Sequence, residues 1–309
     1  MSALVSILIP ARGDLEYFQY ALKSIDDSKF YDFEVIVVDD GISAEKRIWI
    51  AEYFKSKTGY RLVQNSGSGI VDALNTGISH SSSTYIARLD ADDCVSPDRL
   101  AMQVNFLNAN PDVGVVGSQV TYINENGKTV GQSKYLSGYI FKSRKSFKNC
   151  PIAHPSVMIR RDILEEVGGY LSLLKHGGYD LAEDFFLWLR ISKTSSIFNL
   201  QESLTYYRQH DTQVSSRKKE VTLIAALIVY IKSLDHRNTI KTPILLDNFR
   251  IQDIKQIQSW CLREFHFITL IFLYLRLLEI KSSSKVLIFL SNRLARIFSV
   301  AMGFNRVQN

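Results

Sequence analysis

The sequence predicts an α/β protein with a Rossmann-like, mostly parallel mixed sheet flanked by helices and a helical C-terminal extension. Three observations lead to this prediction. Over about the first 120 positions, short runs rich in valine and isoleucine alternate with helically spaced apolar residues, a pattern typical of strands buried on both faces. Acidic residues stand where two of these runs end, and parallel sheets bind ligands beyond the carboxyl ends of their strands. After about residue 215 the chain becomes apolar and basic, with no glycine between Gly178 and Gly303.

The first predicted elements form a β–α–β unit. Val5–Pro10 and Glu34–Asp39 indicate buried strands, and Tyr17–Ile25 between them carries apolar residues at helical spacing. No basic residues precede the first apolar run, so we interpret it as a strand and not as a signal peptide. The following residues predict a strand at Arg61–Gln64, a helix at Gly69–Ser79 and a strand at Tyr85–Leu89.

The later elements are shorter. Val113–Val120 and Ser156–Ile159 are β-like runs, with a turn signal at Asn126-Gly127. Glu183–Ser192 predicts a short helix rich in aromatic residues. A boundary near residue 215 then separates a first domain, 1–215, from a basic helical region, 216–309.

Composition restricts the class of protein. Of 309 residues, 46% are hydrophobic and 22% are charged, which is ordinary for a globular chain and argues against disorder. The three cysteines lie far apart, which fits neither a disulfide framework nor a zinc site and suits a reducing cytoplasm.

The positive charge is concentrated in the C-terminal region. From Lys232 onward twelve Lys and Arg face five Asp and Glu, so this segment carries +7 and residues 1–231 carry −1 of the net +6. A nucleic-acid partner is therefore not expected for the first domain. The apolar stretches of the C-terminal region fall short of the roughly 20 residues that a spanning helix needs. Two interpretations stay open: amphipathic helices on an anionic membrane surface, or a helical subdomain that packs on the first domain or forms a homodimer. The three stretches are Val221–Ile231, Phe265–Leu275 and Val286–Leu290.

An acidic cluster, Asp90-Ala91-Asp92-Asp93, ends the strand predicted at Tyr85–Leu89. Carboxylate oxygens suit Mg²⁺ or Mn²⁺, which would complete its shell with phosphate oxygens and water and neutralise a diphosphate leaving group. The alternative is an acidic N-cap of a helix that starts near Pro97. Arg88 either pairs with one of these acids or contacts a phosphate.

Two further acidic pairs allow both a structural and a chemical interpretation. Asp39-Asp40-Gly41 fits a turn after a strand, or carboxylates that accept hydrogen bonds from a nucleoside. Glu183-Asp184 begins a predicted helix, where acids stabilise the helix dipole. A carboxylate in the same place can also act as a general base that deprotonates a hydroxyl. Spacing alone does not separate these interpretations.

Taken together, these segments resemble the inverting nucleotide-sugar glycosyltransferases of family 2, which have the GT-A fold. The similarity extends over about residues 5 to 215. It rests on Val5-Ser6-Ile7-Leu8-Ile9-Pro10, Val35-Ile36-Val37-Val38-Asp39-Asp40-Gly41, Gly69, Ala73-Leu74-Asn75-Thr76-Gly77-Ile78, Ile86-Ala87-Arg88-Leu89-Asp90-Ala91-Asp92-Asp93, His154-Pro155-Ser156-Val157-Met158-Ile159-Arg160-Arg161, Gly168-Gly169-Tyr170 and Ala182-Glu183-Asp184-Phe185-Phe186-Leu187-Trp188-Leu189-Arg190.

The resemblance implies a role for each matching residue. It places Pro10, Arg12, Asp39 and Asp40 around a uridine, and Asn75 and Arg88 close to the nucleotide. It directs Asp90 to the ribose or donor sugar, makes Asp92 the principal metal ligand, and gives Asp93 a supporting place or a contact with the donor sugar. It makes Asp184 the catalytic base and Glu183 a residue that positions acceptor or donor. It brings Arg208 or His210 to the diphosphate or the metal, and His154 to the acceptor side, where a satisfied loop histidine is the alternative.

The implied reaction transfers one sugar from a UDP-sugar to a hydroxyl of a lipid-linked glycan, with Mn²⁺ or Mg²⁺ and a β-linked product. Residues 1–100 would form the nucleotide-binding half and 101–215 the acceptor half, on a cytoplasmic protein peripheral to the inner face of the plasma membrane. The Gln-x-x-Arg-Trp motif of processive relatives is missing. Arg12 and Asp14 replace the Tyr-Asn of many relatives, which puts the contacts of this loop in doubt.

Two rival functions predict different features. A nucleotidyltransferase would also bring a nucleotide and a metal together, but it should carry a glycine-rich loop with a basic residue after the first strand. Pro10-Ala11-Arg12-Gly13-Asp14 fits that pattern poorly. A catalytically silent binding protein would have no need to keep both Asp92 and Asp184.

Overall fold

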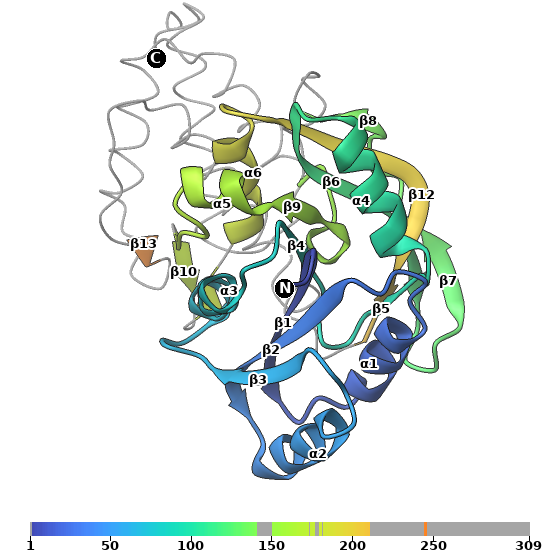
Figure 1. The fold of residues 1–309 in the computed structure, drawn as a ribbon, viewed down its shortest axis with the longest axis vertical. Helices are drawn as coiled ribbons and strands as arrows, with labels where there is room; N and C mark the ends of the chain where they lie inside the picture. Colours follow the sequence, from blue (N-terminus) through green and yellow to red (C-terminus); the bar gives the residue numbers. More distant parts are fainter. Residues whose placement is uncertain are drawn as a thin grey trace, which may run out of the picture.

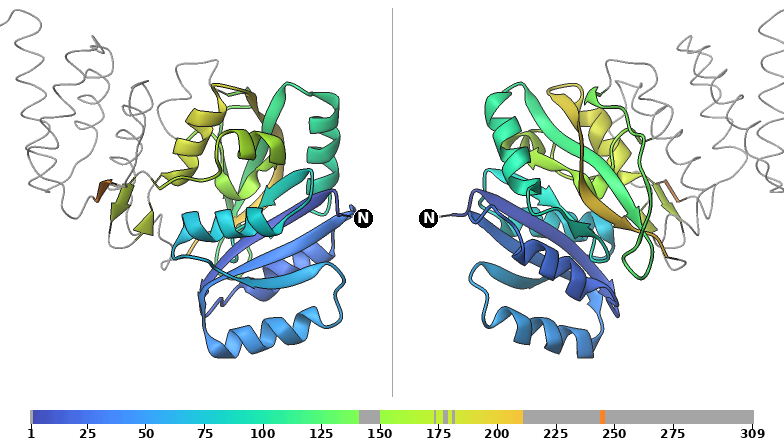
Figure 2. Two further views of the ribbon diagram at one scale, coloured as in Figure 1. Left: turned by 60° about the vertical axis from the view of Figure 1, so that its left-hand side comes forward. Right: turned by 90° about the vertical axis from the view of Figure 1, so that its right-hand side faces the viewer.

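The computed structural model of the protein describes residues 2–140, 150–172, 174–176, 179–180, 182–210 and 244–245. Ten strands form one mixed sheet, in the order β3-β2-β1-β4-β9-β6-β12-β5, with β7 beside β6 and β8 beside β12. Three short strands form a second sheet, β11-β10-β13. Helices cover both faces of the large sheet (Figures 1 and 2).

The N-terminal half of the sheet is parallel. The strands are β1 (Val5–Gly13), β2 (Phe33–Ile42), β3 (Tyr60–Gln64) and β4 (Tyr85–Arg88), and the helices are α1 (Phe18–Asp26), α2 (Ala44–Phe54) and α3 (Ile70–His80). Strand β1 lies between β2 and β4, paired with each in parallel register. The carboxyl ends of these three strands therefore lie along one edge of the sheet.

Alternation along the central strand divides the core into two layers. Ile7 and Ile9 of β1 pack with Phe18 and Leu22 of α1, whereas Leu8 between them packs with α3 on the opposite face. Successive side chains of a strand point to opposite faces, so an unbroken apolar run serves both layers. This explains why the strand shows no polar alternation in the sequence.

The C-terminal half of the sheet contains antiparallel pairs. The strands are β5 (Cys94–Val95), β6 (Val113–Ile123), β7 (Thr129–Gln132), β8 (Gly138–Tyr139), β9 (Met158–Arg160) and β12 (Ser196–Arg208), and the helices are α4 (Arg99–Ala109), α5 (Arg161–Glu166) and α6 (Glu183–Ile191), with a 3₁₀ turn η2 (His154–Ser156). Strand β9 runs antiparallel to both β4 and β6, and β12 runs parallel to β6. The second sheet contains β10 (Leu174–His176), β11 (Tyr179–Asp180) and β13 (Ile244–Leu245).

A buried arginine fixes the end of β4. Arg99 of α4 is 1% exposed, and its Nη2 donates to the carbonyls of Arg88 (2.8 Å) and Val157 (3.1 Å). Gln103, one turn later, donates to the carbonyl of Ser156 at 2.7 Å. Burial, followed by the charge of the nearby Arg88, lowers the pKa of Arg99 to about 9. These bonds tie β4, which leads into the acidic cluster, to the segment before β9.

The β–α–β start, the α3 helix and the strand before the acidic cluster are confirmed. Other elements differ from the prediction, and β5, β7, β8 and α5 were not predicted. Helix α2 and the long strand β12 were not predicted, and Ser156 belongs to η2 while the strand after it starts only at Met158. Helix α2 has one fully buried residue, Ile50, so its apolar pattern is weak.

The predicted basic helical region lies almost wholly outside the described residues. After residue 210 only Ile244–Leu245 is described, and it pairs in parallel with β10. The three apolar stretches, the boundary near 215 and the proposed membrane or dimer surface lie outside the described residues. In the part of the chain that the structure describes, no helix is long and apolar enough to cross a membrane.

Candidate active site

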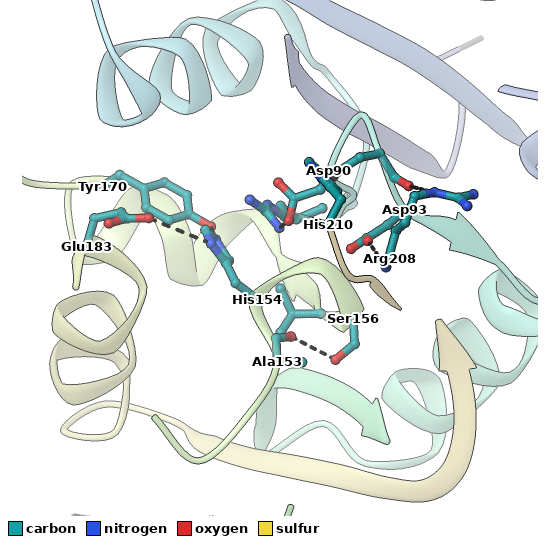
Figure 3. Close-up of polar contacts among 12 residues, drawn as sticks. Asp90, Asp93, Ala153, His154, Ser156, Tyr170, Glu183, Arg208 and His210 are labelled. Atoms are coloured by element: carbon teal, nitrogen blue, oxygen red, sulfur yellow. Dashed lines mark hydrogen bonds and ion pairs between the residues drawn. The ribbon is translucent and has the colours of Figure 1, made fainter. Parts of the chain in front are cut away.

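The three acidic groups meet at the carboxyl edge of the parallel strands. Asp39 and Asp40 are among the last residues of β2, Asp90–Asp93 follow β4, and Glu183 and Asp184 begin α6. Asp184 is close enough to Asp90 to raise its pKa. Figure 3 shows Asp90, Asp93, Arg208 and His210 as one group, and His154, Tyr170 and Glu183 as another beside it. The fold therefore assembles segments that are about 140 residues apart in the sequence.

Each carboxylate of the acidic cluster has a different partner. Arg88 Nη1 donates to Asp90 Oδ2 at 2.5 Å, and His210 Nε2 lies 2.8 Å from Asp92 Oδ2. Asp93 is fully buried and accepts a bond from the backbone N–H of Arg208 at 2.8 Å. One oxygen from each of the three aspartates lies within 4.8 Å of the others. The cluster thus presents hard oxygen ligands around one point.

Burial and crowding raise the pKa values of Asp90 and Asp93. Burial is the main cause for both Asp90 and Asp93, and neighbouring aspartates add to it. Asp93 Oδ2 has no hydrogen-bond partner among the described residues. A divalent cation fits this donor set, because it would favour the ionised carboxylates and prefers oxygen ligands.

The N-cap interpretation of the cluster is wrong. Helix α4 begins at Arg99 and its N-cap residue is Asp98. Strand β5 separates the cluster from that helix. Helix α4 therefore does not explain the charge of Asp90, Asp92 and Asp93.

Arg208 holds the cluster in place by bonding to main-chain carbonyls. Its Nε donates to the carbonyl of Asp92 (2.9 Å), and its Nη1 donates to those of Asn124 (3.1 Å) and Glu125 (3.0 Å). The guanidinium also lies 4.7 Å from the ring centroid of Tyr17. These contacts join the end of β12 to the acidic loop. The predicted approach of Arg208 to a diphosphate stays a prediction, whereas His210 lies directly beside Asp92.

Asp39 and Asp40 have different surroundings. Asp39 is 2% exposed and accepts hydrogen bonds from the N–H groups of Gly41 (3.0 Å) and Ile42 (2.8 Å). Arg47 Nε donates to its other oxygen at 2.7 Å. Asp40 accepts from Asn65 Nδ2 (2.7 Å) and from the N–H of Gly69 (2.9 Å), and Arg12 Nη1 lies 3.7 Å away. The interpretation of this segment as a turn therefore applies to Asp39. The carboxylate of Asp40 instead connects β2 to the loop before α3.

We expect Asp39→Asn to destabilise the fold by about 1–2 kcal/mol at pH 7, because a charged, buried acceptor is lost. Burial alone would raise the pKa of Asp39, but the bonds from Ile42, Arg47 and Gly41 outweigh it and lower the pKa. A lowered folded-state pKa gives stability above the unfolded pKa, and this stability is lost as the pH falls through the folded value.

Urea unfolding of both proteins at a series of pH values measures this effect. The deficit of Asp39→Asn should be full at pH 7 and shrink steadily below about pH 4. Asp98→Asn is the matched control, since it removes an exposed carboxylate that pairs with Lys29, and such pairs contribute little. A deficit that stays constant down to pH 2.5 would contradict the assigned cause.

Pro10 lies at the partly buried end of β1, paired with Val38 of β2. Its position beside Asp39 and Asp40 agrees with the predicted uridine pocket, whose role stays a prediction. Asn75 lies on α3, and its amide bonds to the backbone of Tyr170 in both directions, each at 2.9 Å. Its predicted contact with the nucleotide stays a prediction.

Glu183 and Asp184 are adjacent carboxylates in the first turn of α6. Burial and the charge of Asp184 raise the pKa of Glu183 to about 8. Burial also raises the pKa of Asp184, but the N–H of Phe185 (2.7 Å) and the thiol of Cys150 (3.3 Å) donate to its carboxylate and oppose this. Burial thus raises the pKa values of both carboxyls, and the bonds from Phe185 and Cys150 favour the ionised form of Asp184.

Arg88 links the two acidic groups electrostatically. Its side chain is 7% exposed, and burial, the largest influence, would lower its pKa, while Asp90 raises it. Its charge also opposes the raised pKa values of Glu183 and Asp184. The buried Arg88 cation thus interacts with both the acidic cluster and the Glu183-Asp184 pair.

Three contacts of the site had no signal in the sequence. Cys150 is an isolated cysteine, yet its thiol reaches Asp184. Asn65 follows a short strand and holds Asp40, and Arg99 looks like one more surface arginine in a helix. These contacts join residues that are 11 (Arg99 and Arg88) to 58 (Arg99 and Val157) positions apart, so no local pattern records them.

Comparison with known proteins gives a consistent result. Residues 6–168, more than half of the chain, match the family described as glycosyl transferase family 2. The O-antigen biosynthesis glycosyltransferase WbnJ of Escherichia coli is 29% identical over 212 residues, which cover 67% of this chain and 80% of WbnJ. The amylovoran biosynthesis glycosyltransferase AmsE of Erwinia amylovora is 28% identical over 205 residues, covering 66% and 74% of the two chains.

Solved structures agree on the fold. TarS 1-349 of S. aureus, in complex with UDP-GlcNAc, superposes with a TM-score of 0.59 and 18% identity, covering 86% of this chain and 73% of that one. This likeness confirms the expected GT-A type of α/β architecture. Together with the family match and the acidic groups at the carboxyl edge of the sheet, it leads to one conclusion: the chain is a glycosyltransferase that belongs to glycosyl transferase family 2.

Proposed function

We propose that the protein transfers a single sugar from a UDP-sugar to a hydroxyl of a glycan acceptor, with a divalent metal and with inversion at the anomeric carbon. The observation that carries this proposal is the arrangement around Arg88. On one side lie three carboxylate oxygens within 4.8 Å of one another, and on the other lies the Glu183-Asp184 pair. A site for a diphosphate and a base for a hydroxyl are thus adjacent.

Asp92 and His210 would hold the metal. Asp92 and Asp90 are the more exposed acids of the cluster. In Asp92, 30% of the side chain is exposed, and His210 Nε2 lies 2.8 Å from its carboxylate. Asp93 is tied to the Arg208 backbone and supports the loop, and Asp90 is tied to Arg88. Mn²⁺ or Mg²⁺ bound there would neutralise the charge that develops on the departing diphosphate. We propose that Pro10, Arg12, Asp39 and Asp40 surround the uridine.

Asp184 acts as the base in the proposed reaction. The acceptor oxygen attacks the anomeric carbon while its proton passes to Asp184. The bond between that carbon and the diphosphate oxygen breaks on the opposite side, UDP leaves, and an α-linked donor gives a β-linked product. Arg88, fixed by Asp90, adds a positive charge beside the leaving group.

The acceptor we propose is a lipid-linked precursor of a surface polysaccharide. Support comes from WbnJ and AmsE, which carry O-antigen and amylovoran biosynthesis in their names. The basic C-terminal region offers a surface for anionic lipids, so we propose a cytoplasmic protein peripheral to the inner membrane face. Pairing of two copies through that region is the alternative use of the same segment.

Release of UDP from a panel of UDP-sugars tests the proposal. The full chain should release UDP from at least one of UDP-glucose, UDP-galactose, UDP-GlcNAc and UDP-GalNAc when Mn²⁺ or Mg²⁺ is present, with water or a simple glycoside as acceptor. A nucleotidyltransferase would instead release pyrophosphate from UTP and a sugar phosphate. A silent binding protein would bind UDP-sugars and release no UDP. Either of the last two results would overturn the proposal.

A further inference from the structure

A turn between β9 and α6 joins the nucleotide half to the acceptor carboxylates. Asn75, on α3, donates from Nδ2 to the carbonyl of Tyr170 and accepts from the N–H of Tyr170 at Oδ1. Gly168 and Gly169 both have positive φ, 75° and 69°. A Cβ on Gly169 would lie 2.6 Å from Asn75 Oδ1, so only glycine allows this close approach.

Helix α6 holds the same turn from the other side. Arg190 Nη2 donates to the carbonyl of Gly169, and its guanidinium lies 5.2 Å from the ring centroid of Phe186. Arg190 lies two turns after Glu183 and Asp184 on one helix. The turn at 168–170 is therefore clamped between α3, which follows the loop bound by Asp40, and the helix that carries the acidic pair.

The side chain of Tyr170 continues this connection into the site. Its hydroxyl lies 2.8 Å from His154 Nε2, and His154 Nδ1 lies 4.0 Å from Glu183 Oε1. Tyr170 is 2% and His154 8% exposed, and Figure 3 shows both rings with Glu183. Burial, followed by the charge of Arg88, lowers the pKa of His154 well below its ordinary value. Nε2 of the imidazole is within hydrogen-bond distance of the Tyr170 hydroxyl, whereas Nδ1 packs beside Glu183 at 4.0 Å without a direct hydrogen bond.

We propose that Asn75, Tyr170 and His154 are positioning residues: they hold Glu183 beside Asp184 and couple this pair to the helix that follows the nucleotide loop. The proposal rests on the proposed function and extends it, because it assigns Asn75 to the acceptor carboxylates and not to the nucleotide. Loss of one member should impair the chemical step while donor binding stays intact.

Tyr170→Phe is the sharpest variant, because it keeps the buried ring and removes only the hydroxyl that meets His154. We expect kcat for UDP release to fall about tenfold and KM for the UDP-sugar to stay within about twofold. Tyr85→Phe is the matched control. Tyr85 is also 2% exposed, and its hydroxyl contacts Asn108 at 2.5 Å at the opposite end of β4. Asn75→Ala should lower kcat in the same way, whereas a raised KM would indicate a nucleotide contact and overturn the assignment of Asn75.

A double-mutant cycle makes the test independent of activity. Urea unfolding of Tyr170→Phe, Glu183→Gln and the double variant should show non-additive effects on the unfolding equilibrium constant of about threefold or more. The same cycle with Tyr85→Phe should be additive. Additive effects in the first cycle, together with a kcat equal to that of Tyr85→Phe, would overturn the proposal. If the effects of Tyr170→Phe and Glu183→Gln were non-additive but the wild-type protein released no UDP, the proposed function would be refuted. The connection between Tyr170 and Glu183 would still hold.

Discussion

Replacing Asp184 by asparagine is expected to lower sugar transfer by about 10²–10⁴-fold, the usual contribution of a general base, while donor binding stays nearly unchanged. Asparagine keeps the size of the side chain and its acceptor for the N–H of Phe185, but it cannot take the proton of the acceptor hydroxyl. The expected loss is in kcat, measured as UDP release or product formation. Binding of UDP with Mn²⁺, measured by calorimetry, should be within about twofold of the wild type.

Asp162→Asn provides the control for this substitution. Asp162 also lies in a first helical turn and accepts a bond from the next residue, Ile163, at 2.8 Å, but it is exposed. It should transfer sugar at the wild-type rate. Full turnover by Asp184→Asn would refute the base assignment. If Glu183→Gln lost turnover and Asp184→Asn kept it, Glu183 would be the base.

The pH profile follows from the same pair. Burial raises the pKa of Asp184, and two hydrogen bonds to its carboxylate oppose this rise. We expect kcat to rise with pH as Asp184 loses its proton. Burial and the charge of Asp184 raise the pKa of Glu183 to about 8. The two carboxylates share one titration, so the rate reports the pair and not either residue alone.

Asp92→Ala is expected to produce the second large effect. The substitution removes the carboxylate that faces His210 at 2.8 Å. Loss of groups that merely orient a metal ligand costs 10–100-fold in metal affinity or activity, so loss of the ligand itself should cost at least about 100-fold. Activity titrated against Mn²⁺ measures this directly. The concentration for half-maximal rate should rise strongly, with partial recovery at millimolar Mn²⁺.

Asp98→Ala is the control for the metal assignment. Asp98 follows the acidic cluster closely in the sequence, but its carboxylate pairs with Lys29 at 2.9 Å. Its Mn²⁺ requirement should equal that of the wild type. Undiminished wild-type activity in excess chelator would refute the metal role, whatever Asp92→Ala does.

The strands and the acidic groups could be predicted because their signals are local. A run such as Ile36-Val37-Val38 is buried on both faces, so it is apolar throughout, and Asp90–Asp93 follow such a run directly. Local patterns also suggested a cap for the same acids. Only the position of β5 and the N-cap at Asp98 showed that α4 does not use them.

The remaining parts depend on distant contacts, which no local pattern records. The sequence gives no sign that the amide of Asn75 bonds to the Tyr170 backbone, 95 residues later. Strand β12 mixes polar and apolar residues, because parts of it are exposed, and its pairing with β6 decides its conformation. The thiol of Cys150 and the hydroxyl of Tyr170 gain their significance only from where the fold places Asp184 and His154.

Thermal unfolding in the presence of UDP tests most directly whether the acidic cluster holds a metal against a diphosphate. A ligand that binds only the native state stabilises it by about 2.7 kcal/mol at 100 times its Kd. With Mn²⁺ present, UDP should raise the Tm of the wild-type protein clearly, and EDTA should remove this increase. In Asp92→Ala the increase should be largely lost. An equal increase of Tm by UDP in Mn²⁺ and in EDTA would contradict the account.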